Sequence, residues 1–156
     1  MSDELIEQMY AEKYNTTTTS RKNIGDIYVD GLPINIKSND VNGDNFQPNL
    51  MSADKLFDYL SEPTNNLKFM FVDYEKTEDG VNILKEKLVN AEHISWDCLI
   101  IECQGKGAIQ VKKNKVIIDE TQTREKFLEG FSPAYIDYFK RQREKLDLLE
   151  KKYANV

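Results

Sequence analysis

Three polar residues on a short predicted hairpin have the types and the spacing of a metal-dependent hydrolytic site. Asp26 precedes one apolar run, Asn35 and Lys37 stand at the end of the next, and Asp30-Gly31 between the runs is a turn signal. Neighbouring strands lie about 4.8 Å apart, so side chains from both strands converge. Asn35 and Lys37 share a face because they are two positions apart on one strand. The hairpin therefore predicts that these three side chains lie close together.

Such a group of side chains suits the hydrolysis of a phosphodiester. A carboxylate such as that of Asp26 holds Mg²⁺, for which Mn²⁺ substitutes. A lysine beside the metal orients the attacking water and offsets the charge that builds up on the phosphate. Asn35 stands where a second carboxylate is expected, and its amide oxygen can bind a cation but brings no charge. An ordinary exposed hairpin is the competing interpretation, because hairpins with an Asp-Gly turn are common.

The composition is that of a globular chain with one domain. The 156 residues suffice for a single domain with its own core, which we take as residues 1–156. A hydrophobic content of 40% and a charged content of 31% are typical of globular rather than disordered chains. No apolar run approaches the ~20 residues of a membrane span. The acidic N-terminus lacks the pattern of a signal peptide, so we expect a cytoplasmic protein with no membrane partner.

The net charge of −6 disfavours indiscriminate binding to polyanions. The basic residues nevertheless cluster at positions 21–22, 112–115 and 140–145. An acidic protein with local basic patches can still bind phosphate groups, particularly where a divalent metal adds positive charge. DNA binding is therefore compatible with the composition.

Hydrophobic periodicity predicts helices and strands that are mixed along the chain, with no linker that would divide it. We expect helices over residues 2–13, from about 50 to 61, over 123–131, and from Ser132-Pro133 onward, with the serine as N-cap. We expect strands over residues 27–29, 33–36, 67–74, 81–89, 96–103, part of 104–111, and 115–119, and a long surface loop over 39–49. This order predicts an α/β fold with a central mixed β-sheet flanked by helices.

Several segments resemble one family of nucleases. The spacing from Asp26 to Asn35-Ile36-Lys37 is similar to the PD-(D/E)XK motif, and the order of the further segments resembles the type II restriction endonucleases of the HincII and EcoRV branch. The resemblance extends over residues 24–130. Its segments are DI (26–27), NIKS (35–38), QPNLMSADKL (47–56), ISW (94–96), GAIQV (107–111) and TREKF (123–127).

The resemblance implies a restriction-endonuclease-like fold and a role for each hairpin residue. Asp26 would be the shared metal ligand and Lys37 the catalytic lysine. Asn35, where the family usually has Asp or Glu, would complete or modulate the metal shell, or else it means weakened or lost cleavage. A glutamate of the first helix would supply the missing charge. The candidates are Glu4, Glu7 and Glu12, and we take Glu12 as the metal ligand because it is nearest to the hairpin in sequence.

The implied activity is Mg²⁺-dependent, site-specific cleavage of double-stranded DNA by a homodimer. A palindromic site calls for a two-fold symmetric protein, since protein symmetry mirrors site symmetry. The first helix, with Met9 and Tyr10, is a candidate dimer surface. The basic segment at residues 140–145 is interpreted first as a solvated helix face and second as a phosphate contact.

Two segments have the donors and acceptors that read base edges. The first is the glycine-containing stretch 104–107, whose glycines allow close backbone approach; an ordinary tight turn is the equal alternative. The second is the loop over residues 39–47, for which a solvated loop is the alternative. The residues proposed to contact DNA are Gln104, Gly105, Lys106, Gly107 and Gln110 from the first region, and Ser38, Asn42, Asn45, Gln47 and Asn49 from the second.

Two other functions remain open from the sequence. One is a repair or nicking nuclease on the same fold. The other is a non-catalytic DNA-binding or protein-interaction domain, which Asn35 favours and which the presence of Asp26 and Lys37 disfavours. Metal dependence separates these functions, because an interaction domain should show no effect of Mg²⁺ or Mn²⁺ on DNA binding or stability.

Overall fold

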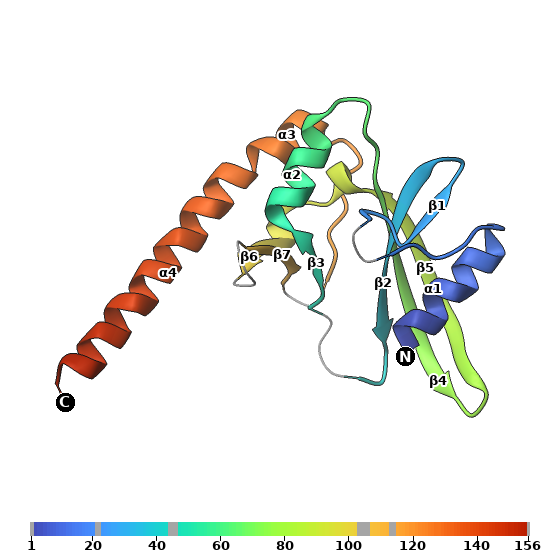
Figure 1. Cartoon of the computed structure of the whole chain (residues 1–156), viewed down its shortest axis with the longest axis horizontal. Helices are drawn as coiled ribbons and strands as arrows, with labels where there is room; N and C mark the ends of the chain where they lie inside the picture. Colours follow the sequence, from blue (N-terminus) through green and yellow to red (C-terminus); the bar gives the residue numbers. More distant parts are fainter. Residues whose placement is uncertain (1, 21–22, 44–46, 103–106, 113–114, 156) are drawn as a thin grey trace.

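The computed structural model describes residues 2–20, 23–43, 47–102, 107–112 and 115–155. In chain order its elements are α1 (Ser2–Lys13), β1 (Ile27–Val29), β2 (Leu32–Asp40), β3 (Asn49–Ser52), α2 (Ala53–Ser61), β4 (Lys68–Thr77), β5 (Gly80–Asn90), the short 3₁₀ helices η1 (Ala91–His93) and η2 (Trp96–Cys98), β6 (Leu99–Glu102), β7 (Ala108–Val111), α3 (Arg124–Glu129) and α4 (Phe131–Ala154). The fold class is α/β, as predicted (Figure 1).

The larger sheet has the strand order β1-β2-β4-β5. Strands β1 and β2 form the predicted hairpin, whose turn residues Asp30 and Gly31 both have positive φ values of 51° and 77°. Positive φ at both central residues is the type I′ turn, which matches the twist of the strands and favours glycine. Strand β2 then runs parallel to β4, and β4 pairs with β5 antiparallel. The parallel pair needs a long crossover, which contains β3 and α2.

A smaller antiparallel sheet, with the strand order β3-β7-β6, accompanies the larger one. The strands therefore form two sheets, whereas we expected one central sheet. In Figure 1, α1 lies against the larger sheet, while α2, α3 and α4 gather around the smaller one. Two apolar clusters form the core: one lies between α1 and the larger sheet, and the other joins the opposite face of the larger sheet, through Phe69 and Val89, to the smaller sheet and its helices.

The first cluster fixes α1 on the larger sheet. Ile6, Tyr10 and Ala11 of α1 are buried against the alternate residues of β2, Ile34 and Ile36. Because side chains alternate along a strand, Asn35, Lys37 and Asn39 point to the opposite face of the sheet. Tyr10 is 3% exposed and its hydroxyl donates to Glu86, so Tyr10 packs within its own chain, and the use of this helix as a dimer surface stays a prediction.

The second cluster is larger and rich in aromatic rings. Trp96, Phe127 and Phe131 pack with ring centroids 5.0–5.6 Å apart, and the Trp96 indole also donates to the Phe127 carbonyl oxygen at 2.8 Å. Gly130, between α3 and α4, is required here because a Cβ would lie 2.2 Å from the Trp96 Nε1 atom. These contacts set the angle at which α4 leaves the body.

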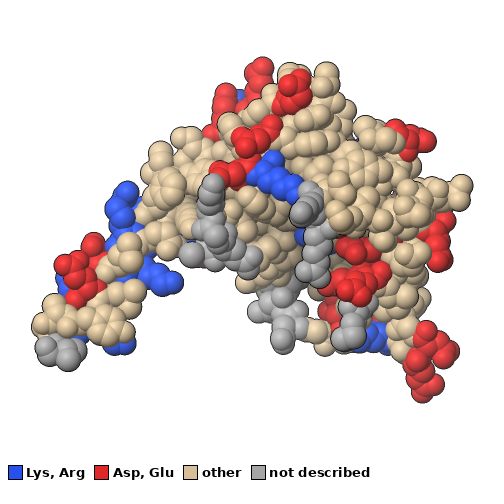
Figure 2. Space-filling model, viewed as in Figure 1, with Lys and Arg blue, Asp and Glu red and all other residues tan. Residues whose placement is uncertain are grey.

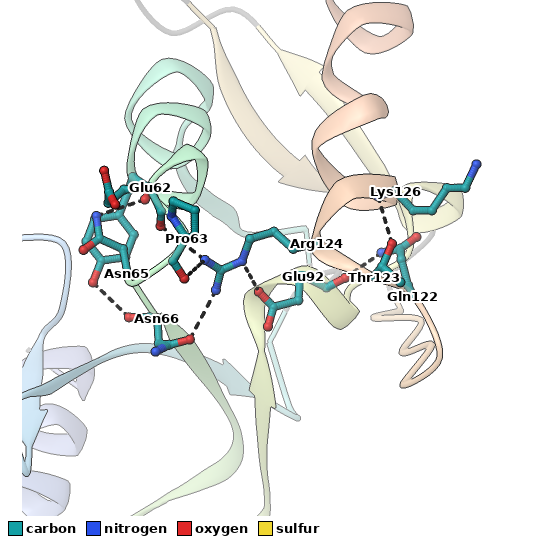
Figure 3. Close-up of polar contacts among 10 residues, drawn as sticks. Glu62, Pro63, Asn65, Asn66, Glu92, Gln122, Thr123, Arg124 and Lys126 are labelled. Carbon is teal, nitrogen blue, oxygen red and sulfur yellow. Dashed lines mark hydrogen bonds and ion pairs between the residues drawn. The ribbon is translucent and has the colours of Figure 1, made fainter.

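A partly buried polar cluster around Arg124 ties α3 to two other segments (Figure 3). The guanidinium forms an ion pair with Glu92 at 3.0 Å and donates to the carbonyl oxygens of Glu62 and Pro63 and to the Asn66 amide oxygen. Both charged side chains are at most 20% exposed. Each edge of the guanidinium therefore has an acceptor, which fixes the end of α2 and η1 relative to α3.

Four element boundaries differ from the sequence prediction. Residues 49–52 form strand β3 where we expected the start of a helix, because their backbone pairs with β7. Residues 115–119 make only an isolated bridge between Ile94 and Ile118. Helix α4 begins at Phe131 with Gly130 as N-cap, because the aromatic cluster holds that residue, so Ser132 is not the cap. The loop after β2 is shorter than expected, since β2 extends to Asp40 through its pairing with β4.

The helices of the described residues include none with the length and apolar character that crossing a membrane requires.

Candidate active site

Asp26 lies at the point where β1 leaves β2. Its backbone N–H donates to the Ile34 carbonyl at 2.8 Å, and its Oδ2 accepts from the Ile36 N–H at 2.6 Å. The carboxylate thus occupies the edge of β2 that β1 no longer covers. The regular register of the hairpin ends with Ile27 facing Ile34, and the Asp26 N–H bonds to Ile34 as well, so the backbone leaves that register at Asp26. The Asp26 carboxylate nevertheless lies beside Asn35, because it binds the N–H of the next residue, Ile36.

Glu7 of α1 is the glutamate that the structure brings to Asp26. The two carboxyl groups share a hydrogen bond, and burial, followed by the charge of Asp26, raises the pKa of Glu7 from 4.5 to about 7. Near neutral pH the pair therefore holds one proton in part of the molecules. Two carboxylates that share a proton are typical of catalytic and metal-binding sites.

Glu12, which we predicted as the ligand, lies elsewhere on the helix. Five residues of α-helix correspond to a rotation of about 140° from Glu7. Glu12 is exposed and accepts a hydrogen bond from the Gln8 amide at 3.3 Å. Because Ile6 and Tyr10 face the sheet, Glu7 rather than Glu12 is directed to its edge.

Asn35 is a buried polar residue, with 9% of its surface exposed. Its Nδ2 donates to the Ile24 carbonyl oxygen at 3.2 Å, which fixes the orientation of the amide. Its Oδ1 is buried and has no hydrogen-bond partner among the described residues. A buried acceptor without a partner costs free energy of order 1–3 kcal/mol, so a ligand for this oxygen would be stabilising.

Lys37 is partly buried in an acidic environment. Burial lowers the pKa of its ammonium group, and the charges of Asp26, Glu7 and Asp3 act in the opposite direction. Asp3 is held in place by the Ser38 hydroxyl, which donates to its carboxylate. A lysine with a lowered pKa gives up its proton more readily than an exposed lysine does.

We call Glu7, Asp26, Asn35 and Lys37 the edge site. Among the described residues, no three histidine, cysteine, aspartate or glutamate side chains lie close enough together to hold a metal ion. The edge site offers two carboxylates and one neutral amide oxygen instead. These donors fit Mg²⁺ or Mn²⁺, because both ions prefer oxygen ligands and a cation can replace the proton that Glu7 and Asp26 share.

A groove of about 650 Å³ opens on the face of the sheet that carries Asn35 and Lys37. It lies between β2, β4 and β5 on one side and residues 115–118 on the other. Three exposed lysines line it: Lys85, Lys87 and Lys115. Lys37 pairs with Phe71 on β4, and Phe71 pairs with Lys87 on β5, so these three residues form one row across the sheet. The groove therefore begins beside the edge site.

The predicted DNA contacts fall into three groups. Asn45, Gln104, Gly105 and Lys106 lie outside the described residues. The Gly107 carbonyl accepts from Ala53, and Gln110 pairs with Asn49 in the smaller sheet and donates to the Gln47 carbonyl at 3.2 Å. Ser38 contacts Asp3, while the Asn42 backbone N–H donates to Asp40. The structure thus brings Gln47, Asn49 and Gln110 together and places Ser38 beside the edge site.

Asp3, Glu7 and the three groove lysines were not chosen from the sequence as site residues. Asp3 and Glu7 are four residues apart, which places them on one face of α1, and this spacing is a readable signal. The groove lysines have no comparable signal, because Lys115 meets Lys85 and Lys87 only through the tertiary fold.

No protein-family model matches the chain, and no curated protein matches its sequence. The resemblance to the PD-(D/E)XK nucleases therefore stays a prediction, and the function is inferred from the chemistry of the edge site.

Proposed function

We propose that this protein is a Mg²⁺-dependent endonuclease that cleaves double-stranded DNA at specific sites, as type II restriction enzymes of the PD-(D/E)XK superfamily do. One observation carries the proposal: the carboxyl groups of Glu7 and Asp26 lie within hydrogen-bond reach of each other at an open strand edge, near the partly buried Lys37. Like charges held together cost stability, and such an arrangement is typical of functional sites.

Each residue of the edge site would have its own role. Asp26, Glu7 and the Asn35 oxygen would hold Mg²⁺ or Mn²⁺, which when bound supplies positive charge to the phosphate and makes a coordinated water more acidic. Asp26 is oriented by the Ile36 N–H, and Asn35 by the Ile24 carbonyl. Lys37 would donate to the non-bridging phosphate oxygen, where negative charge increases during in-line attack.

The groove next to the edge site would hold the DNA backbone. Lys87 lies two strands away from Lys37, which is about 10 Å. Lys85, Lys87 and Lys115 would then contact phosphates adjacent to the one that is cleaved. Gln47, Asn49 and Gln110, together on the smaller sheet, are the candidates for base contacts.

The test is digestion of plasmid and phage DNA with Mg²⁺ or Mn²⁺, using the wild type, Lys37→Ala and Asn35→Asp. Lys126→Ala is a matched control, because Lys126 is 72% exposed on α3 and pairs only with its neighbour Glu129 in the described structure. Discrete fragments from the wild type and the control, lost in Lys37→Ala, would support the proposal. Cutting by Asn35→Asp alone would identify a nuclease attenuated by Asn35. No cutting by any protein would reject it.

The second candidate is a non-catalytic DNA-binding or protein-interaction domain. The observation in its favour is Asn35, because with an amide at this position the edge site has two carboxylates instead of three. This candidate predicts DNA binding or partner binding that is unchanged by EDTA, and no cleavage by Asn35→Asp. A repair or nicking nuclease would instead cut one strand without sequence preference, which the same digestion reveals as nicked circles.

A further inference from the structure

Helix α4 projects away from the body of the molecule (Figure 1). Its first turns are held by the body: Phe131 and Tyr138 are buried, and Arg141 contacts Glu102 and the Ile101 carbonyl, each at 2.6 Å. From Arg143 to Ala154 every residue is exposed. An isolated helical segment of this length is marginally stable in water, because helices shorter than about 12–15 residues need tertiary contacts. This part of α4 therefore lacks the packing that would stabilise it.

Four apolar residues and one glutamine are regularly spaced from the end of the packed part of α4 through its projecting part. They are Phe139, Gln142, Leu146, Leu149 and Tyr153, separated by steps of 3, 4, 3 and 4 residues, and we call these five positions the α4 seam. Alternating steps of three and four are the a and d positions of a heptad repeat, which places the residues along one side of a helix. Leu146 is 64% exposed and Tyr153 is 65% exposed, so the seam is uncovered in a single chain.

One edge of the seam continues the helix face that the body covers. Phe131 and Tyr138 precede Leu149 by 18 and 11 residues, which corresponds to nearly whole numbers of turns, whereas Leu146 lies about 60–80° around the helix from them. The seam is thus offset from the packing face, and it extends about three turns beyond the last contact with the body. Figure 2 shows both basic and acidic side chains along this helix.

We propose that the α4 seam is the interface of a parallel two-stranded coiled coil with a second copy of this chain. The flanking charges favour this occupant and this orientation. With Leu146 at an a position, Lys145 is at g and Glu150 is at e, and parallel strands bring Lys145 of one chain to the partner's Glu150 in both directions. Gln142 at a central d position pairs with itself in a parallel dimer and so specifies the register.

This dimer does not depend on the nuclease proposal, but it would serve it. A two-fold axis along α4 would place two edge sites symmetrically, as a palindromic DNA site requires.

The test is sedimentation equilibrium of the full chain, with paired leucine variants. Leu146→Lys puts two charges in the seam and should raise the dimer dissociation constant at least about a hundredfold. Leu148→Lys is the matched control, because Leu148 is 69% exposed but lies about 200° around the helix from Leu146. Its dissociation constant should stay within about threefold of the wild type. A monomeric wild type at 100 micromolar (about the upper end of such experiments), or equal effects of the two variants, would overturn the proposal.

Two further variants test the orientation. Leu149→Cys occupies a d position, where parallel strands bring identical residues together, so mild oxidation should give a covalent dimer that the wild type does not form. Glu150→Lys should weaken the dimer at low salt, and Lys145→Glu combined with Glu150→Lys should restore it. Absence of the cross-link together with a failed charge reversal would exclude the parallel coiled coil. DNA cleavage is not measured in any of these experiments, so their failure leaves the proposed function untouched.

Discussion

The Arg124 cluster and the edge site are both partly buried polar groups that join distant segments, but they are built in opposite ways. Around Arg124 every charge meets an opposite charge or a carbonyl oxygen. At the edge site two acids share a proton, and the Asn35 oxygen has no partner among the described residues. The first arrangement contributes stability, whereas the second costs stability. Proteins retain such costs at functional sites, where a ligand offsets them.

Arg124→Ala should have the largest effect on stability. It leaves Glu92 and several carbonyl oxygens without their donor, and we expect the free energy of unfolding to fall by about 3 kcal/mol. Urea denaturation measures this change. Lys126→Ala, on the exposed side of the same helix, should stay within about 0.5 kcal/mol of the wild type. Similar values for the two variants would show that the Arg124 cluster does not hold the fold together.

The second-largest effect is expected from Asn35→Asp, which should make the stability of the edge site depend on a bound cation. It adds a third carboxylate at a position that is 9% exposed, and without metal we expect a loss of about 2 kcal/mol in the free energy of unfolding. Mg²⁺ at millimolar concentration should restore that loss, since an ion that binds only the folded state stabilises it. Thermal unfolding with Mg²⁺ and with EDTA is the measurement. The same loss in both solutions would argue against a cation site, and Asn42→Asp on an exposed loop controls for added charge.

The smallest effect is expected from Glu7→Gln, and it depends on pH. Glu7 keeps its proton in the folded chain up to about pH 7, whereas the unfolded chain releases it near 4.5. The folded state therefore binds more protons between these values, and its stability falls as the pH rises through them. Glu7→Gln removes this penalty and should stabilise the protein at pH 8 by about 1 kcal/mol, a value reduced for partial exposure, with little effect at pH 4.5.

Denaturant titrations at both pH values measure the effect of Glu7→Gln. Glu12→Gln, on the exposed side of α1, should follow the wild type at each pH. A stabilisation by Glu7→Gln that is equal at pH 4.5 and pH 8 would contradict the shared proton.

The sequence predicted the elements whose structure depends on residues close together in the chain. The Asp-Gly turn fixed the hairpin and hence brought Asp26 next to the part of β2 that carries Asn35. The apolar run after residue 66 correctly predicted β4. The sequence did not show which glutamate of α1 lies beside Asp26, because the choice between Glu7 and Glu12 depends on how Ile6 and Tyr10 dock on the sheet. Strand β3 was missed since its pairing with β7 overrides the helical pattern that follows.

The most direct test of the edge site is calorimetric binding of Mn²⁺ at pH 6.5 in two buffers of different ionisation enthalpy. We predict one ion per chain and the release of most of one proton, because Glu7 is protonated at that pH and must ionise to bind. Glu7→Gln should abolish the proton release, and Asp26→Asn should weaken binding at least about tenfold. Absence of binding, or binding that neither variant alters, would contradict the assignment of Glu7, Asp26 and Asn35 to a metal site.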